Sequence, residues 1–334
     1  MARVAVDALG GDQAPRVIVE GAVAAVRAAP GLAVTLVGPH GRVQDELDRI
    51  PGASALDIRI ADAPDLVAMD ESPAKALRRK PHATIKVAAE LVARGEAAAL
   101  FSAGNTGASV LAAYKAFGLI GGADRPALAA TLPTQSGTAV LLDVGANANC
   151  RPDHLLTFGV MGAVFARVGL GTAHPRVGLL SIGEEESKGN ALTRDAHALL
   201  KASGLRFIGN VEARDVYSGA ADVVVCDGFT GNVVIKVSEG VAEMVDAVWQ
   251  QGTVERSPSA AAAPEAFERF RRRLDYSEYG GAPLLGVKGV CIVGHGRSSE
   301  KAVRNAIIMA HRFALEEMTA RIEQELSVVP RTQS

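Results

Sequence analysis

Short, continuous apolar runs that end in glycine-rich polar turns recur along this chain, and a helical stretch usually follows. Continuous apolar residues, unlike an alternating pattern, are typical of strands that are buried on both faces of a sheet. The runs with their turns cover residues 4–11, 34–38, 98–107, 139–147, 177–186, 223–232 and 290–299, and helical periodicity covers 15–29, 106–117, 153–168, 190–203 and 298–326. The repetition predicts an α/β fold, an open Rossmann-like sheet wrapped by helices.

The chain has 334 residues, a length that suits one large domain or two ordinary ones, and we treat 1–334 as a single α/β catalytic domain. Ligands of such sheets bind beyond the carboxyl ends of the strands. The polar turns lie at those ends. We therefore expect turns that are far apart in the sequence to converge on one crevice.

Residues 237–276 depart from this alternation. An apolar stripe at helical spacing is formed there by Val237, Val241, Met244, Val245, Val248 and Trp249. After a loop of small residues, a second amphipathic stretch carries Phe267, Phe270 and Leu274 beside Arg269, Arg271, Arg272 and Arg273. We interpret the segment as a projecting helical hairpin. Its first helix suits core or dimer packing, and its second suits a membrane surface or an acidic partner.

Composition excludes several classes of function. The formal net charge of −2 and an aromatic content of 4% argue against a nucleic-acid binder. The first apolar run is broken at Asp7, which argues against a signal peptide, and we find no apolar stretch of the length that spans a membrane. Cys150, Cys226 and Cys291 are far apart, which indicates free thiols in a reducing cytoplasm. No histidine spacing indicates a metal site, and we expect no cofactor.

Common catalytic templates are absent. The sequence contains no GxxxxGK[ST], no GxSxG and no HExxH, and GHGRSS and GLGTAH both lack the third glycine of a dinucleotide fingerprint. Three glycine turns at strand ends remain, SAGNTG (102–107), DGFTGN (227–232) and GHGRSS (294–299). Small residues allow main-chain N–H groups to approach an anion, and a following helix N-terminus adds partial positive charge. Together the turns indicate a site for phosphate or another oxyanion, although each alone suits a helix cap.

Polar side chains accompany these turns. Asp7, Asp143 and Asp227 each end a strand, where an aspartate either stabilises the turn or orients donors toward a ligand. His295 is the only histidine inside a glycine turn, and it could donate a hydrogen bond to an oxyanion or protonate a leaving group.

Seven motifs in a fixed order carry a resemblance to a known family. They are DALGGDQAP (7–15), SAGNTGA (102–108), DVGAN (143–147), IGEEESKGN (182–190), DGFTGN (227–232), EYGGAPLLGVKG (278–289) and GHGRSS (294–299). From about residue 3 to residue 320 the chain resembles the bacterial phosphate acyltransferase family, PlsX. That family forms acyl phosphate from acyl-acyl carrier protein and inorganic phosphate, in phospholipid (phosphatidic acid) biosynthesis.

The resemblance has further implications. It implies a three-layer α/β/α sandwich like that of isocitrate and isopropylmalate dehydrogenases and of phosphotransacetylases. It also implies a cytoplasmic homodimer, peripherally associated with the inner face of the membrane and in possible contact with the downstream glycerol-3-phosphate acyltransferase. The partners that it implies are acyl carrier protein and inorganic phosphate.

The implied reaction is attack of a phosphate oxygen on a thioester carbonyl, which calls for a cation and fixed donors rather than for a covalent enzyme intermediate. We expect Lys188, Asn190, His295 and Asn232 to be catalytic. The residues expected to bind phosphate or substrate are Asp7, Gly10, Gly11, Ser102, Gly104, Asn105, Thr106, Gly107, Asp143, Asn147, Glu184, Glu186, Asp227, Gly228, Thr230, Gly231, Gly294, Gly296 and Ser298.

Three glutamates stand directly before Lys188. We expect Glu184 and Glu186 to pair with its ammonium, and Glu185 to face solvent. Two basic clusters could dock an acidic carrier protein, 78–80 and 271–273. Two other functions stay open: a nicotinamide-dependent dehydrogenase on the same fold, and a non-enzymatic scaffold recruited to membranes.

Overall fold

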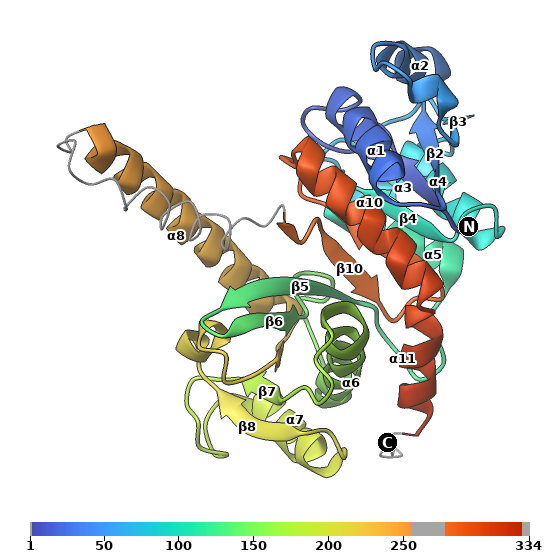
Figure 1. The fold of residues 1–334 in the computed structure, drawn as a ribbon. Coiled ribbons are helices and arrows are strands. Elements are labelled where there is room, and N and C mark those ends of the chain that lie inside the picture. The colour runs from blue at the N-terminus through green and yellow to red at the C-terminus, as the bar shows by residue number, and fades with distance from the viewer. Residues whose placement is uncertain (1, 255–277, 329–334) are drawn as a thin grey trace.

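The computed structural model describes residues 2–254 and 278–328 (Figure 1). One eleven-stranded sheet has the order β3-β2-β1-β4-β11-β10-β5-β6-β9-β7-β8. The strands are β1 Ala2–Asp7, β2 Leu32–Gly38, β3 Ile58–Asp62, β4 Ala99–Ser102, β5 Ala127–Thr134, β6 Gly137–Leu142, β7 Val177–Leu180, β8 Phe207–Val211, β9 Val223–Val225, β10 Ala282–Leu285 and β11 Val290–Val293. Every expected run therefore contains a strand, and the sheet adds β3, β5, β8 and β10, which the sequence pattern did not reveal.

Helices cover both faces of this sheet. They are α1 Arg16–Ala28, α2 His40–Asp48, α3 Pro73–Arg79, α4 Thr84–Ala93, α5 Thr106–Phe117, α6 Pro152–Leu170, α7 Ala191–Ala202, α8 Gly228–Val254, α10 Glu300–Leu315 and α11 Met318–Ser327, with 3-10 turns η1 Ala53–Ala55 and η2 Ala213–Tyr217. One core contains side chains of α1, α6, α7, α10 and α11, and a second contains those of α3, α4 and α5. The predicted three-layer α/β/α sandwich is confirmed.

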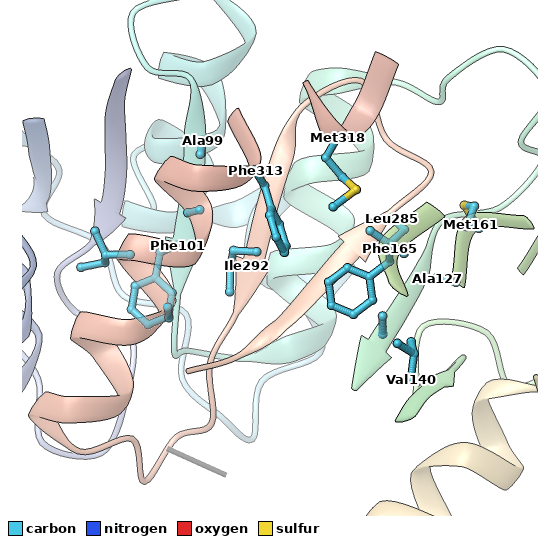
Figure 2. Close-up of a cluster of buried hydrophobic side chains, with 14 of the residues drawn as sticks. Ala99, Phe101, Ala127, Val140, Met161, Phe165, Leu285, Ile292, Phe313 and Met318 are labelled. Carbon is cyan, nitrogen blue, oxygen red and sulfur yellow. The ribbon is translucent and has the colours of Figure 1, made fainter. Parts of the chain in front are cut away.

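Each strand contributes side chains to both of these cores, because successive side chains point to opposite faces of a sheet. Phe101 of β4 lies in the first core and its neighbour Leu100 in the second. In the first core Phe313 of α10 meets Phe165 of α6 edge to face, with ring centroids 5.6 Å apart. Figure 2 shows both rings in the cluster of buried side chains that also contains Ile292 of β11 and Leu285 of β10. The aromatic contact joins the two halves of the sheet.

The direction of the strands reverses near the middle of the sheet. β3, β2, β1, β4 and β11 are parallel, β10 is antiparallel to both β11 and β5, and β5 is antiparallel to β6. β6, β9, β7 and β8 are again parallel to one another. Twist of about 20–25° per strand adds up to about 100–125° over the five steps from β4 to β9. A twist of this size turns the carboxyl ends of the two halves toward each other, whereas a flat sheet would leave them at opposite edges.

Helix α8 differs from the expected hairpin. It begins at Gly228, directly after β9, whereas the sequence predicted the first hairpin helix from residue 237. The DGFTGN segment supplies the first turn of this helix, because Asp227 caps it. The helix projects from the sheet as a long rod (Figure 1). The second predicted hairpin helix, with its aromatic and arginine residues, lies outside the described residues.

Two further helices correct the sequence analysis. The single stretch expected at 298–326 is two helices, α10 and α11, because Glu317 adopts a left-handed φ of 53° between them. Among the described helices, α6 has the length and apolar composition that could span a membrane, although no such stretch was expected. In this structure 67% of that stretch is buried within the protein, as in a core helix.

Phe313 tests the importance of the joint between the halves. We expect Phe313→Ala to lower the free energy of unfolding by about 3–5 kcal/mol, because the ring is 1% exposed and its removal leaves a cavity. Urea denaturation measures the change. Leu315→Ala on the same helix is the matched control: its side chain is 58% exposed, and a change below about 0.5 kcal/mol is expected. Equal effects of the two substitutions would contradict this account.

Candidate active site

The turns after β1, β4 and β11 meet around one buried carboxylate, that of Asp7. Ser102 donates its hydroxyl to Asp7 Oδ2 at 2.7 Å, and the Leu9 N–H donates to Oδ1 at 3.2 Å. The Gly104 N–H in turn donates to the Ser102 hydroxyl at 3.1 Å. Burial raises the pKa of Asp7, and the hydrogen bonds from Ser102 and Leu9 oppose that effect. Asp7 thus joins two turns that are 95 residues apart in sequence.

Glycines allow these turns to come this close. A Cβ on Gly10 would lie 2.7 Å from the Gly104 nitrogen and 2.8 Å from Asp7 Oδ2. Gly11 has a φ of 117°, which disfavours any other residue, and faces the Gly296 carbonyl. That carbonyl accepts the Asp12 N–H at 2.8 Å. The predicted convergence of DALGGD, SAGNTG and GHGRSS is therefore real.

Asn105 has a different task from the expected one. Its side-chain oxygen caps α5 by accepting the Ala108 N–H, and its amide nitrogen lies 3.1 Å from each of the carbonyls of Ala68, Met69 and Glu71. The amide therefore clamps the loop at 68–71 and is occupied by the protein itself. The neighbouring Thr106 and Gly107 are exposed at the first turn of α5.

His295 stands half-buried at the rim of this group. Its Nδ1 accepts the Arg297 N–H at 3.1 Å, and its backbone N–H donates to the hydroxyl of Ser298. Its Nε2 lies 4.0 Å from Glu239 Oε1 on α8. Burial, followed by the smaller effects of Lys236 and Arg297, lowers the pKa of His295, although Glu239 and Asp12 oppose the shift. The net shift favours the neutral imidazole.

A second buried carboxylate, Asp143, organises the end of β6. Its Oδ1 accepts the N–H groups of Leu128, Gly145 and Ala146 at 2.9, 3.2 and 3.0 Å. Its Oδ2 accepts both the backbone and the side-chain N–H of Asn147, at 2.7 and 2.9 Å. Burial raises the pKa of Asp143 against these bonds. In this structure Asp143 stabilises the DVGAN turn, and Asn147 also donates to the Pro126 carbonyl.

The DGFTGN segment lies against this turn. Asp227 caps α8 through the backbone and hydroxyl of Thr230, and the Gly228 N–H donates to the Asn147 carbonyl at 2.8 Å. A Cβ on Gly231 would lie 1.9 Å from the Asp143 carbonyl oxygen, so only glycine fits there. The exposed side chain of Asn232 lies beside Gly145. Of the polar side chains of this segment, that of Asn232 is exposed.

The loop at 181–190 follows β7, the neighbour of β9. Glu186 pairs with Lys201 at 2.5 Å and Glu184 with Arg214 at 3.6 Å, so the expected pairing of these glutamates with Lys188 is not found. The reason is a tight turn, in which the Lys188 N–H donates to the Glu185 carbonyl at 2.9 Å and the flanking carboxylates point to α7 and η2. Glu185 is exposed, as expected.

Lys188 is exposed, and its stem packs on Gly183, where a Cβ would come within 2.8 Å of Lys188 Cγ. No carboxylate of a described residue forms an ion pair with its ammonium. Asn190 caps α7 by accepting the Thr193 N–H at 2.9 Å. An uncompensated cation therefore stands next to a helix N-terminus, which is a favourable place for an anion.

The predicted residues thus form two regions. Those at the ends of β1, β4 and β11 are Asp7, Gly10, Gly11, Ser102, Gly104, Asn105, Thr106, Gly107, Gly294, His295, Gly296 and Ser298. Those at the ends of β6, β9 and β7 are Asp143, Asn147, Glu184, Glu186, Lys188, Asn190, Asp227, Gly228, Thr230, Gly231 and Asn232. Helix α8 starts in the second region and reaches the first at Glu239, roughly 16 Å along its axis.

Sequence reasoning missed Lys236 and Glu239 on that helix. Lys236 Nζ lies 3.0 Å from Glu239 Oε2, and the same carboxylate faces His295. Their signal was present in the sequence, because Lys236 and Glu239 follow Asn232, the last residue of DGFTGN, at the spacing of one helical face. Among the described residues, no group of three His, Cys, Asp or Glu side chains could hold a metal ion.

Solved structures show which fold this chain shares. The chain superposes on a phosphotransacetylase from Streptococcus pyogenes with a TM-score of 0.64 and 15% identity, covering 94% of both chains. A branched-chain phosphotransacylase from Enterococcus faecalis gives 0.56 and 16%, covering 94% of this chain and 99% of the other. A 4-hydroxythreonine-4-phosphate dehydrogenase from Klebsiella pneumoniae gives 0.52 and 15%, covering 94% and 100%. The fold is thus of the phosphotransacetylase type.

Proteins with similar sequences show the family to which the chain belongs. The model of a family described as "Fatty acid synthesis protein" matches residues 2–321. A phosphate acyltransferase from Trichlorobacter lovleyi is 47% identical over 328 residues, 97% of this chain and 94% of that protein. One from Nitratidesulfovibrio vulgaris is 46% identical over 327 residues, 97% and 94% of the two chains. The chain belongs to the phosphate acyltransferase family, PlsX, and is a transferase that moves an acyl group to phosphate.

Gly10 tests the close approach of the turns. We expect Gly10→Ala to lower the free energy of unfolding by about 1–3 kcal/mol, because its Cβ would collide with backbone at Gly104 and with the buried carboxylate of Asp7. Chemical denaturation measures the loss. Gly41→Ala is the control: a Cβ at Gly41 of α2 meets no atom within 4 Å, and stability should stay the same or rise by up to about 1 kcal/mol. A Gly10→Ala protein as stable as wild type would overturn the argument.

Proposed function

We propose that this phosphate acyltransferase takes its acyl group from acyl-acyl carrier protein, and that inorganic phosphate attacks the thioester directly, in phospholipid biosynthesis. The leaving thiol has an ordinary pKa of about 8.5, so its departure as a thiolate needs little acid assistance. The harder task is to bring a phosphate dianion to a carbonyl that itself becomes negative. Fixed donors and a cation perform that task.

One observation carries the proposal: the ammonium of Lys188, which forms no ion pair with any described residue, lies beside the N-terminus of α7. Lysine suits phosphate as a compact point charge. Asn232 follows β9, the strand next to β7, so its amide is on the same side of the sheet. Lys188 and Asn232 would hold the phosphate, and the donors of the first region would receive the acyl thioester.

The thiols of the protein support direct attack. Burial raises the pKa of Cys150 to about 11 and that of Cys291 to about 12, and it raises the pKa of the buried Cys226 well above its ordinary value. Thiols with such pKa values carry almost no thiolate at pH 7, and the thiolate is the nucleophile. A covalent acyl-cysteine intermediate is therefore disfavoured at all three positions.

The comparisons do not support the two other functions considered from the sequence, a dehydrogenase and a non-enzymatic scaffold. The likeness to a dehydrogenase, at 15% identity, concerns the fold alone. A non-enzymatic scaffold conflicts with membership in an enzyme family whose members are named for acyl transfer to phosphate.

Lys188 provides the test. We expect Lys188→Met to reduce kcat for phosphate-dependent acyl-phosphate formation about 10²–10³-fold, because the substitution removes the cation and keeps a stem that packs on Gly183. The assay follows acyl phosphate and free carrier protein, with circular dichroism to verify folding. Lys201→Met, which removes a nearby lysine paired with Glu186, should stay close to wild type. Normal turnover of a folded Lys188→Met protein would refute the proposed role.

The proposal includes a homodimer joined through α8. Val237, Val241, Met244 and Val248 are 60, 49, 58 and 62% exposed, an unusual amount of apolar surface for one helix. Their 4-3-4 spacing is that of the a and d positions of a coiled coil, which packs against a like helix. The polar residues Lys236 and Glu239 face the first region of the site instead. A second copy of this chain therefore fits the stripe.

We expect Val237→Lys combined with Met244→Lys to convert the dimer into a monomer, because two buried ammonium groups would lose their hydration at the interface. Size-exclusion chromatography with light scattering measures the mass. Glu243→Gln, on the opposite side of the same helix, should leave the dimer intact. A dimer that survives the double substitution would place the interface elsewhere.

Two contacts complete the proposal. The carrier protein is acidic, and of the predicted cluster at 78–80 the exposed Arg78 and Arg79 remain available, because Lys80 pairs with Glu71 at 2.5 Å. The cluster at 271–273 lies outside the described residues. The helix that we expect to meet the cytoplasmic face of the membrane and the downstream acyltransferase also lies outside them.

Two measurements test these contacts. If charge reversal at Arg78 and Arg79 leaves the KM for carrier protein unchanged, these arginines do not dock the carrier. If the full-length protein does not co-sediment with anionic vesicles, the membrane contact is excluded.

A further inference from the structure

A buried side chain, that of Asn210, ties the loop that carries Lys188 to the sheet. Asn210 lies in β8 and is 6% exposed, and its side-chain Nδ2 donates to the Glu185 carbonyl at 2.9 Å. The same carbonyl accepts the backbone N–H of Lys188, also at 2.9 Å. One oxygen atom therefore connects the backbone of the lysine to a side chain that is anchored in the sheet.

The ion pairs of the same loop restrain it less. In the pair of Glu184 and Arg214 the side chains are 68 and 72% exposed, and in that of Glu186 and Lys201 they are 66 and 62% exposed. Exposed pairs contribute little, because water and salt screen them and two long side chains lose conformational freedom. The hydrogen bond from Asn210 comes from a buried amide, so we expect it to be the stronger restraint.

The orientation of the amide follows from its partner. A carbonyl oxygen accepts hydrogen bonds and donates none, so the nitrogen of Asn210 rather than its oxygen faces Glu185. The buried oxygen, Oδ1, accepts no hydrogen bond from the described residues. The protein thus offsets the burial of only half of this amide, and asparagine is also a poor strand former. An apolar residue of the same size would suit the fold equally well, which leaves the bond to the loop as the contribution of Asn210.

We propose that Asn210 is a positioning residue for Lys188. Its amide fixes the Glu185 carbonyl, and that carbonyl fixes the backbone of the lysine. The stem of Lys188 is bounded by Gly183, where a Cβ would lie 2.8 Å from Lys188 Cγ. The ammonium is thereby held beside the N-terminus of α7 instead of moving with an exposed loop. This inference rests on the proposed function, in which Lys188 holds the attacking phosphate.

A displaced ammonium affects the two substrates differently. Phosphate interacts with the cation directly, and that attraction falls as the distance grows. The acyl thioester meets the donors of the first region instead. Loss of the Asn210 amide should therefore weaken the binding of phosphate and leave that of acyl-acyl carrier protein unchanged. A merely structural role would reduce the fraction of folded enzyme, which lowers kcat and changes neither KM.

The test compares Asn210→Leu, which keeps the size of the side chain and removes the donor, with Ser181→Ala as the matched control. The Ser181 hydroxyl is buried at the start of the same loop, and no described residue forms a hydrogen bond with it. We expect Asn210→Leu to raise the KM for phosphate about 10-fold, with an unchanged KM for acyl-acyl carrier protein. Ser181→Ala should behave as wild type, and both variants should melt close to the wild-type temperature.

A double-mutant cycle tests whether Asn210 acts through Lys188. In a Lys188→Met background, Asn210→Leu should have no further effect on the KM for phosphate, because the cation to be positioned is gone. Hydrogen exchange of the loop at 181–190, measured without substrate, should be faster in Asn210→Leu than in wild type and unchanged in Ser181→Ala. Asn210→Ala, with the same expected changes, takes the place of Asn210→Leu if that protein does not fold.

A wild-type KM for phosphate in the folded Asn210→Leu protein, or an effect that persists in the Lys188→Met background, would overturn the proposal. Equal changes in Asn210→Leu and Ser181→Ala, or unaltered exchange of the loop, would do the same. Wild-type activity is measured first. Its absence would refute the proposed function, while the exchange measurement would still decide whether Asn210 restrains the loop.

Discussion

The reversal of strand direction inside one continuous sheet is the constraint on which the site depends. β10 runs antiparallel to β11 and β5, and β5 runs antiparallel to β6, so the carboxyl ends of the two halves would leave a flat sheet at opposite edges. The accumulated twist that is usual for sheets turns the two sets of ends toward each other. Helix α8 starts at one set and touches the other. Under the proposed function, the twist of the sheet and the path of α8 allow polar turns from both halves to serve one reaction.

Within each half, a buried carboxylate gathers the turns and is fully used in doing so. Asp143 accepts five hydrogen bonds from the DVGAN turn and β5, and Asp7 accepts those of Ser102 and Leu9. These bonds offset the cost of burying the two groups. Many of the polar groups in these turns thus bind one another and stabilise the fold. Under the proposed function, the chemistry belongs to the side chains that reach outward, above all Lys188 and Asn232.

The sequence was informative where the physical signal is local. Continuous apolar runs marked strands, and Asn105 and Asn190 cap the helices that were expected after them. Glycine turns indicated close backbone approach, which Gly10 and Gly231 demonstrate. The sequence analysis did not predict β5 and β10, because it looked for an apolar run followed by a turn and a helix, and neither of these antiparallel strands is followed by a helix. The break between α10 and α11 was not predicted because a single left-handed residue, Glu317, carries no glycine or proline signal.

Composition and motif order by themselves determined the fold class, the family, and the residue types of an anion site, since these depend on short-range periodicity and on which side chains can bind phosphate. Only the tertiary structure decided which charged side chains pair with one another. It paired Glu184 and Glu186 with Arg214 and Lys201 rather than with Lys188, and it placed Glu239 beside His295 across a gap of 56 residues in sequence. Charges attract whichever opposite charge lies within a few ångströms, and that distance is set by the twist of the sheet and the path of α8, which no local pattern encodes.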